Sequence, residues 1–241
     1  MTLLQCNGFA RSITIVAALL ATVPAFADER QSMVGSTITV GSELDYPPYA
    51  SVDAAGHAAG YSVDLIRAVA REVGLQLDIQ VGPWSQIKAK LQRGELDALP
   101  LVAYSTERDK YFDFSTPHII SHASVFVRKD HPRLSTLEDL RGKEAIVMRG
   151  DSSHEFIVSA QVAKKIFTTD TVAAAFRQLS SGRHDFVVAP KLSGLLLLQQ
   201  LDIDNIEPFG PPLEAYGKGY AFAVRKGNTH RAIALKLLLS H

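Results

Sequence analysis

The stretch that decides the fold reads Gly94-Glu95-Leu96-Asp97-Ala98-Leu99, then Ser105-Thr106-Glu107-Arg108, then Phe114-Ser115-Thr116-Pro117-His118. Its apolar residues predict a buried strand that leads into a strand-to-helix turn at Arg108. Arginine stays charged and holds a carboxylate through two parallel hydrogen bonds. Such a turn also offers free backbone N–H groups. We therefore predict an anion-binding loop in a ligand cleft rather than a catalytic centre.

The segment before this stretch alternates between strand and helix patterns. β-branched residues over Thr37 to Gly41 predict a buried strand, and the prolines within Asp45 to Tyr49 predict a loop. Ser62 is the predicted N-cap of a helix that ends at Gly74. The next predicted elements are a strand at Leu75 to Val81, a helix at Trp84 to Arg93 and a strand at Ala98 to Val102. This order predicts an α/β lobe with a mostly parallel sheet.

A second α/β unit follows the first. Its predicted elements are strands at Ser124 to Arg128, Ala145 to Met148, Phe186 to Ala189 and Tyr220 to Val224, and helices at Leu137 to Gly142, His154 to Ala163, Thr171 to Leu179 and Leu192 to Gln200. Two such units joined by two extended crossings predict a hinged clamshell with the ligand between its lobes. We expect the first lobe at 28–123, the second at 124–216 and a return to the first at 217–241.

The N-terminus has the pattern of a cleaved secretory signal. Arg11 precedes an apolar run from Ile13 to Val23, and Pro24-Ala25-Phe26-Ala27 supplies a cleavage site, which predicts a signal peptide at residues 1–27. The alternative is an uncleaved membrane anchor, for which the run is short. Cys6 precedes the run and cannot be a lipid-attachment cysteine, so the mature chain has no cysteine and no disulfide. We expect a soluble periplasmic protein.

Composition narrows the classes of function. The chain has 25 Lys and Arg residues against 25 Asp and Glu residues, with both signs scattered, which does not predict a surface for nucleic acid. The histidines show no metal-binding spacing, and no P-loop, dinucleotide fingerprint or Gly-x-Ser-x-Gly elbow occurs. The sequence therefore predicts neither a metal nor a cofactor.

Several short motifs stand in a fixed order along the chain. They are Gly41 to Tyr49, Gly60 to Leu65, Gly94 to Asp97, Ser105 to Arg108, Phe114 to Pro117, Leu137 to Lys143 and Gly182 to Asp185. With them the chain resembles the family-3 extracellular solute-binding proteins, the periplasmic type II Venus-flytrap receptors. The resemblance implies a two-lobed α/β clamshell of the periplasmic-binding-protein type. The scattered charges lead us to expect no nucleic-acid partner. It implies a small-molecule solute, a membrane permease for ABC-type uptake or a sensor's transmembrane helix as partner, and a monomer.

The resemblance also implies a set of ligand-binding residues, namely Glu43, Tyr46, Trp84, Ala103, Arg108, Ser152, Ser153 and Lys191. Tyr46 and Trp84 fall where the family places two aromatic walls around the ligand. Arg108 falls on the family's carboxylate-binding arginine, and a hydroxyl at Ser152 assists on the same carboxylate. Glu43 falls where an acidic residue meets a cationic end of the ligand.

Three departures from the family pattern matter. Pro190-Lys191 stands where amino-acid receptors carry an aspartate for the ligand's ammonium group, which favours a ligand with two acidic groups or a neutral or aromatic acid. Leu99 to Tyr104 replaces a hydroxyl-bearing segment. Both features resemble the flytrap domains that sense ligands for histidine kinases and diguanylate cyclases more than transport receptors. The chain also stops at His241, which implies either a short final helix or a truncated sensor domain.

Each candidate has a plainer interpretation beside the functional one. Arg108 and Lys191 are also compatible with exposed surface positions, Trp84 with core packing, Glu43 with a solvated loop, and Ser152-Ser153 with a helix cap. A different class of function also stays open. Secreted cyclohexadienyl dehydratases, which act on prephenate or arogenate, use the same fold, and Glu43 is the candidate acid for such an enzyme.

Overall fold

The computed structural model describes residues 35–131 and 136–227, so the predicted signal peptide and the C-terminal end lie outside the described residues. The first part of the chain forms β1 (Thr37–Glu43), β2 (Asp45–Tyr46), β3 (Ala50–Val52), β4 (Ala58–Ala59), α3 (Tyr61–Glu72), β5 (Gln76–Gly82), α4 (Trp84–Arg93), β6 (Ala98–Ala103), η1 (Arg108–Lys110) and β7 (Phe112–Phe114). The rest forms β8 (Ile119–Arg128), η2 (Leu137–Leu140), β9 (Glu144–Met148), α5 (Ser152–Ala160), β10 (Lys165–Thr169), α6 (Val172–Ser180), β11 (Phe186–Pro190), α7 (Lys191–Gln200) and β12 (Ile206–Arg225).

The first lobe is built on parallel strands. β1 pairs in parallel with β5 along its whole length and with β6 at Val40 and Ala98. Two hydrogen bonds fix the start of β6 to β1. Asp97 accepts them from the backbone N–H and the hydroxyl of Thr39, at 2.8 and 3.0 Å. Apolar side chains of α3 and α4 cover the sheet, with Ile66 and Leu91 fully buried. The predicted parallel α/β lobe is confirmed, and the half-buried Asp97 has a structural role in it.

The second lobe repeats this design. β9 lies between β10 and β11, all three in parallel, and the helices α5, α6 and α7 contact this group of strands. The strand β10 is absent from the sequence-based prediction. The first four residues of Lys165–Thr169 alternate between exposed and half-buried positions and the last is buried, so no continuous apolar run marks the strand. Phe126 and Phe176 pack edge to face in the core of this lobe, with ring centroids 5.1 Å apart.

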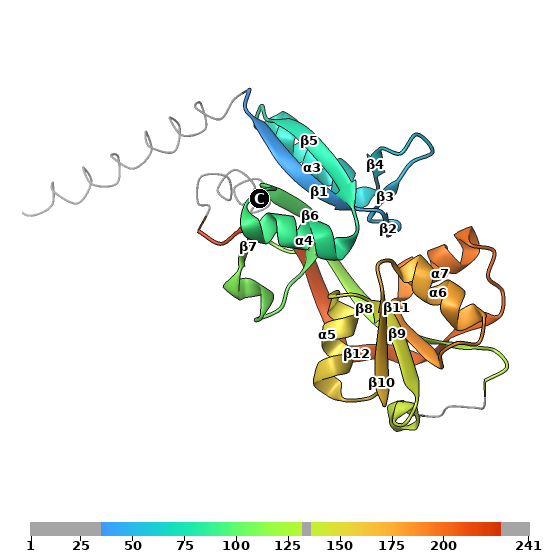
Figure 1. Ribbon diagram of the computed structural model, residues 1–241. Coiled ribbons are helices and arrows are strands. Elements are labelled where there is room, and N and C mark those ends of the chain that lie inside the picture. Colours follow the sequence, from blue (N-terminus) through green and yellow to red (C-terminus); the bar gives the residue numbers. More distant parts are fainter. Residues whose placement is uncertain (1–34, 132–135, 228–241) are drawn as a thin grey trace, which may run out of the picture.

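Two long strands join the lobes. β8 and β12 run antiparallel to one another, and the strand order β10-β9-β11-β8-β12-β6-β1-β5 makes one sheet continuous through both lobes. Figure 1 shows the two bodies connected at these strands, with α4 of the first facing α5 of the second. The register of β12 against β8 shifts between Phe209 and Leu213 and again before Lys218. Such irregularities bend a strand, and here they lie at the crossing between the lobes.

Some local predictions were wrong. Gly60, not Ser62, is the N-cap of α3, and its φ of 114° together with the Tyr49 carbonyl 2.7 Å from a hypothetical Cβ leaves room only for glycine. Asp151, not a serine, is the N-cap of α5. Asp45 and Tyr46, predicted as loop, pair with β3 as a two-residue strand. No helix among the described residues is long and apolar enough to cross a membrane.

Candidate functional site

The first side of the cleft is formed by the start of α4. Trp84 follows Pro83 directly, and its indole Nε1 donates a 2.7 Å hydrogen bond to the carbonyl of Gly150 in the opposite lobe. Lys88 lies one helical turn further on, and its Nζ donates to the same carbonyl at 2.8 Å. The Lys88 ammonium also lies 5.4 Å from the centroid of the Trp84 ring. Trp84 is only 3% exposed, so it serves both the core and the contact between lobes.

Arg108 completes this side of the cleft. Its side chain is buried and stacks on Trp84, with the guanidinium carbon 5.0 Å from the ring centroid. Nη1 donates to the carbonyl of Ala103 at 3.0 Å, and Nη2 donates to the Gly150 carbonyl at 3.3 Å. Nε donates to the Glu155 carboxylate at 3.1 Å. We call Trp84, Lys88 and Arg108 the cationic corner of the cleft.

The turn at Arg108 differs from the prediction. Only three residues, Arg108–Lys110, form a short 3₁₀ helix there. The backbone N–H of Arg108 donates to the Ser105 hydroxyl at 3.2 Å. The prediction of free N–H groups at this turn was therefore wrong for Arg108, whose guanidinium rather than backbone donates to the second lobe.

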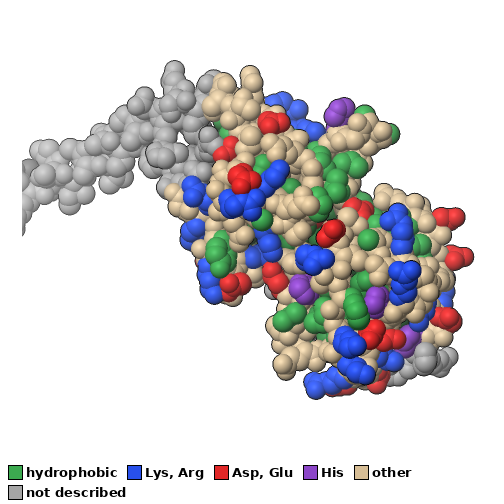
Figure 2. All heavy atoms as spheres, viewed as in Figure 1, with side chains coloured by type: hydrophobic (Ala, Val, Ile, Leu, Met, Phe, Trp, Pro, Cys, Tyr) green, Lys and Arg blue, Asp and Glu red, His purple; other side chains and the backbone are tan. Residues whose placement is uncertain are grey.

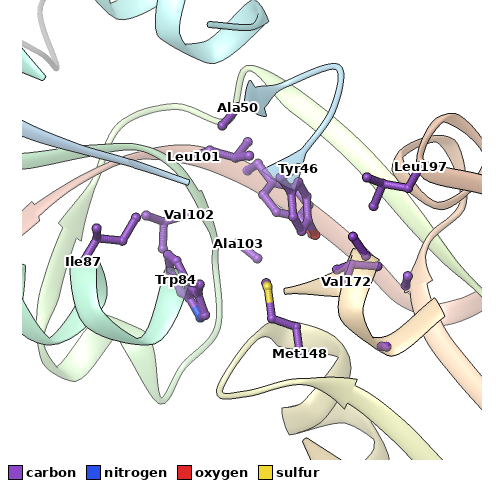
Figure 3. Close-up of a cluster of buried hydrophobic side chains, with 14 of the residues drawn as sticks. Tyr46, Ala50, Trp84, Ile87, Leu101, Val102, Ala103, Met148, Val172 and Leu197 are labelled. Carbon is purple, nitrogen blue, oxygen red and sulfur yellow. The ribbon is translucent and has the colours of Figure 1, made fainter. Parts of the chain in front are cut away.

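Tyr46, predicted as the second aromatic wall, lies in the short strand β2. Tyr46 is buried, and its hydroxyl is 2.8 Å from the hydroxyl of Tyr220 on β12. The Tyr220 hydroxyl is in turn 3.5 Å from Oγ of Ser152, the first residue of α5. Figure 3 shows the Tyr46 and Trp84 rings on either side of Ala103, with the Met148 side chain reaching toward the same place from the second lobe. A chain of hydroxyl groups thus connects the first lobe, the crossing strand and the second lobe.

Two carboxyl groups form what we call the acidic corner, Glu43 and Asp151. Glu43 ends β1 and is 7% exposed, and Asp151 is 4% exposed. Asp151 accepts a hydrogen bond from the backbone N–H of His154 at 2.7 Å, as expected of an N-cap. Its second oxygen, Oδ2, has no hydrogen-bond partner among the described residues.

Burial determines the charge of the acidic corner. It raises the pKa of Glu43 to about 8, with help from the negative charge of Asp151 and against the pull of Arg108. Burial likewise raises the pKa of Asp151 to about 7, against the His154 N–H and Arg108. Near neutral pH Glu43 therefore stays largely protonated and Asp151 partly protonated, whereas ordinary carboxylates are ionised.

A further contact between the lobes lies beside this corner. Asp45 accepts a hydrogen bond from the backbone N–H of Ala173, at the start of α6, at 3.1 Å. Burial raises the pKa of Asp45, although this hydrogen bond opposes the shift. Figure 2 shows the surface hollowed where the two bodies meet, with Lys, Arg, Asp and Glu side chains interspersed over the face in view.

The predicted site residues are placed as follows. Contacts bring Trp84, Ala103 and Arg108 together on one side, and Tyr46 and Ser152 are linked through Tyr220. Ser153 is fully buried beside Asp151. Lys191 begins α7 and is half-buried, and no hydrogen bond or ion pair joins it to the other predicted site residues within the described chain.

Sequence reasoning missed Lys88, Asp151 and Glu155. A signal for two of them was present, because Lys88 follows Trp84 by four residues and Glu155 follows Asp151 by four, the spacing that places side chains on one face of a helix. A separate hollow of about 450 Å³ lies on the outside of the first lobe, where its lining includes Arg67 of α3 and Leu77 of β5. It contains none of the predicted site residues.

Comparison with known proteins identifies the family of this chain. Residues 38–237 match the model of the bacterial extracellular solute-binding proteins, family 3. The chain belongs to this family. Its fold as a two-lobed type II clamshell, recognised from the ordered motifs, is thereby confirmed.

Proteins similar to this solute-binding protein include two amino-acid-binding proteins and one sensor domain. The L-cystine-binding protein TcyJ of Escherichia coli (strain K12) is 28% identical over 222 residues, which cover 90% of this chain and 82% of that protein. A solved histidine kinase sensor domain similar to periplasmic binding proteins has a TM-score of 0.81 and 32% identity, covering 87% and 90% of the two chains. An ancestral arginine-binding protein bound to arginine has a TM-score of 0.77 and 30% identity, covering 86% and 92%.

Proposed function

We propose that this solute-binding protein closes around a small amino-acid-like solute and that Arg108 binds the solute's carboxylate. The observation that carries the proposal is the place of Arg108, buried against Trp84 at the junction of the lobes. A guanidinium held by an aromatic ring and a carbonyl is pre-oriented for a carboxylate, which reduces the entropy lost on binding. Tyr46 supplies the second ring, and the Ser152 hydroxyl lies within the hydroxyl chain that faces it.

The acidic corner supports a solute that also carries a cationic group. Glu43 and Asp151 are buried carboxyl groups, and a solute ammonium or guanidinium beside them would let both release their protons. The sequence-based preference for an acidic or neutral solute rested on Lys191, which has no contact with the acidic corner among the described residues. The family relatives that bind arginine and cystine are consistent with a solute that has both charges.

Closure would transmit the binding event to a membrane partner. Contacts to both lobes form together only when the clamshell is shut, so a solute that touches both sides shifts the equilibrium toward closure. We propose a periplasmic monomer whose closed form is read by an uptake permease or by a sensor's transmembrane helix. The transport relatives support the first partner, and the histidine kinase sensor domain supports the second.

The proposal is tested by identifying the solute. Protein purified without refolding is denatured and the released small molecules are analysed by mass spectrometry. In parallel, the melting temperature is followed with each common amino acid and with L-cystine. A bound solute raises the melting temperature in proportion to the logarithm of its concentration. An amino acid that is both released and stabilising supports the proposal, whereas no shift with any of them refutes the amino-acid class.

One observation favours the enzyme alternative. Glu43, with a pKa of about 8, holds a proton near neutral pH inside the cleft, as a general acid for eliminating water from a cyclic acid must. Incubation with prephenate or arogenate and measurement of the aromatic product decides the matter. Product formation that is lost in Glu43→Gln would establish the dehydratase, and the absence of product would leave the receptor.

A further inference from the structure

More hydrogen-bond donors meet at the Gly150 carbonyl than it has lone pairs to accept. The indole of Trp84, the ammonium of Lys88 and the guanidinium of Arg108 all lie within 3.3 Å of this oxygen. A carbonyl oxygen has two lone pairs, whereas these three side chains carry nine N–H donors by general chemistry, about four times what one oxygen takes. The Gly150 carbonyl alone therefore cannot accept from all the donors of the cationic corner.

The chain itself supplies an anion for these donors. Oε1 of Glu155 in the second lobe lies 3.1 Å from both Nε and Nη2 of Arg108 in the first lobe. This edge of the guanidinium, formed by Nε and Nη2, is one of the edges on which a carboxylate forms two parallel hydrogen bonds. Glu155 therefore already occupies a position in which the carboxylate of a solute would bind.

Glu155 differs from its partner in exposure. Its side chain is 36% exposed, whereas that of Arg108 is 5% exposed. The Glu155 carboxylate can rotate into water without leaving a buried charge unpaired, provided that another anion takes its place on Arg108. Lys88, in contrast, donates to a backbone carbonyl that has no rotamer and cannot turn away.

We infer that Glu155 is an internal counter-ion that the solute's carboxylate displaces from Arg108, while Lys88 joins the lobes through Gly150 both before and after this exchange. The inference rests on the proposed function and specifies how the same site is regulated. Glu155 stabilises the closed form without a solute and competes with the solute, so it weakens binding. Lys88 stabilises the closed form in both cases, so it strengthens binding.

The two variants should therefore change affinity in opposite directions. Glu155→Gln keeps the shape of the side chain and removes the competing charge, and it should tighten binding by about fivefold to tenfold. Lys88→Met keeps the length of the side chain and removes the bond to Gly150, and it should weaken binding by a similar factor, about fivefold. Glu138→Gln is the matched control, because Glu138 is an exposed glutamate of the same lobe that pairs with Arg141. Calorimetric titrations with L-arginine, L-glutamate and L-cystine measure the affinities.

A measurement without solute separates this inference from the proposed function. Nitroxide labels on Gln92→Cys of α4 and Ser159→Cys of α5, two exposed positions on facing helices, report the distance between the lobes. Both Glu155→Gln and Lys88→Met should shift the distribution to longer distances, and Glu138→Gln should not. Circular dichroism of each variant verifies that it is folded.

The outcomes are distinct. Tighter binding by Glu155→Gln with weaker binding by Lys88→Met supports the inference. A Glu155→Gln protein that matches Glu138→Gln in affinity and in distance overturns it, as does equal weakening by both variants. If none of the three amino acids binds the wild-type protein, the proposed solutes are wrong. In that case unchanged distances in both variants refute the contact between lobes, and longer distances support it.

Discussion

The cationic and acidic corners lie in one cleft but balance their charges in different ways. In the cationic corner, Arg108 is held by the Glu155 carboxylate and by two backbone carbonyls, so its charge is fully compensated by the protein. In the acidic corner, Glu43 and Asp151 are buried near one another, and their pKa values rise because burial outweighs the attraction of Arg108. One corner is satisfied by the chain, and the other is neutralised by protons.

This difference indicates how the cleft can recognise charge. A solute carboxylate exchanges with an existing partner at the cationic corner, which costs about as much electrostatic energy as it recovers. A solute cation at the acidic corner replaces protons and gains an attraction that the chain does not supply. We therefore expect the cationic corner to orient the solute and the acidic corner to select for its positive charge.

Removing Arg108 should change the affinity for the solute more than any other substitution at the two corners. Arg108→Ala leaves the Glu155 carboxylate and the Trp84 face without their cation and removes the carboxylate anchor, so affinity for an amino acid should fall at least about a hundredfold, roughly 3 kcal/mol. Calorimetric titration measures the loss. Arg93→Ala, an exposed arginine of α4, is the control and should bind as the wild type does. Unchanged binding by Arg108→Ala would remove the cationic corner from the site.

The acidic corner should make the free energy of unfolding depend on pH. In the folded protein Glu43 and Asp151 keep protons up to pH values of about 8 and about 7, whereas their unfolded carboxyls have already ionised. The folded state therefore binds more protons, and the free energy of unfolding should fall, by on the order of a few kcal/mol, as the pH rises from about 6 to 9.

Urea unfolding at several pH values checks this expectation. The double variant Glu43→Gln, Asp151→Asn should lose most of the slope. His118, whose pKa burial lowers from 6.5 to about 4, acts in the opposite sense between these two values, because charging it disfavours the folded state, so its effect ends near the lower edge of this window. A wild-type slope equal to that of the double variant would show that the acidic corner is ionised in the folded protein.

The selectivity of the protein between L-arginine and L-glutamate should distinguish the acidic corner from the cationic corner. Glu43→Gln removes a potential negative charge but preserves volume, so it should weaken binding of L-arginine by about tenfold while changing binding of L-glutamate much less. Competition titrations with both amino acids measure the ratio. An equal change for both would indicate a packing effect rather than recognition of charge.

The smallest expected effect concerns the hydroxyl chain. Tyr46→Phe removes the hydrogen bond to the Tyr220 hydroxyl but keeps the ring, so stability should fall by about 1 kcal/mol, with little change at either corner. The melting temperature measures the loss, and Tyr111→Phe, at an exposed tyrosine, is the control. A large loss of affinity in Tyr46→Phe would instead place this hydroxyl in direct contact with the solute.

The sequence predicted the elements whose signals are local. Trp84 to Arg93 forms a helix that ends at Gly94 in the left-handed conformation, as its apolar spacing and glycine stop indicate. The parallel order of β1, β5 and β6 follows from the alternation of strands and helices. Arg108 lies in one of the ordered motifs, Trp84 falls where the resemblance places an aromatic wall, and the structure stacks one on the other.

Only the tertiary structure decided the charges of the cleft. Glu43 and Asp151 are 108 residues apart, the difference of their numbers, and neither segment alone shows that they share one buried space. Likewise, nothing in the segments around Lys88, Arg108 and Glu155 shows that the first two donate to the Gly150 carbonyl of the other lobe, or that Arg108 pairs with Glu155. Spacing along a chain determines which side chains share a face of a helix, because that geometry is local. The pKa of a carboxyl and the partner of a guanidinium depend on burial and on charges brought together by folding, and here both depend on contacts between the two lobes.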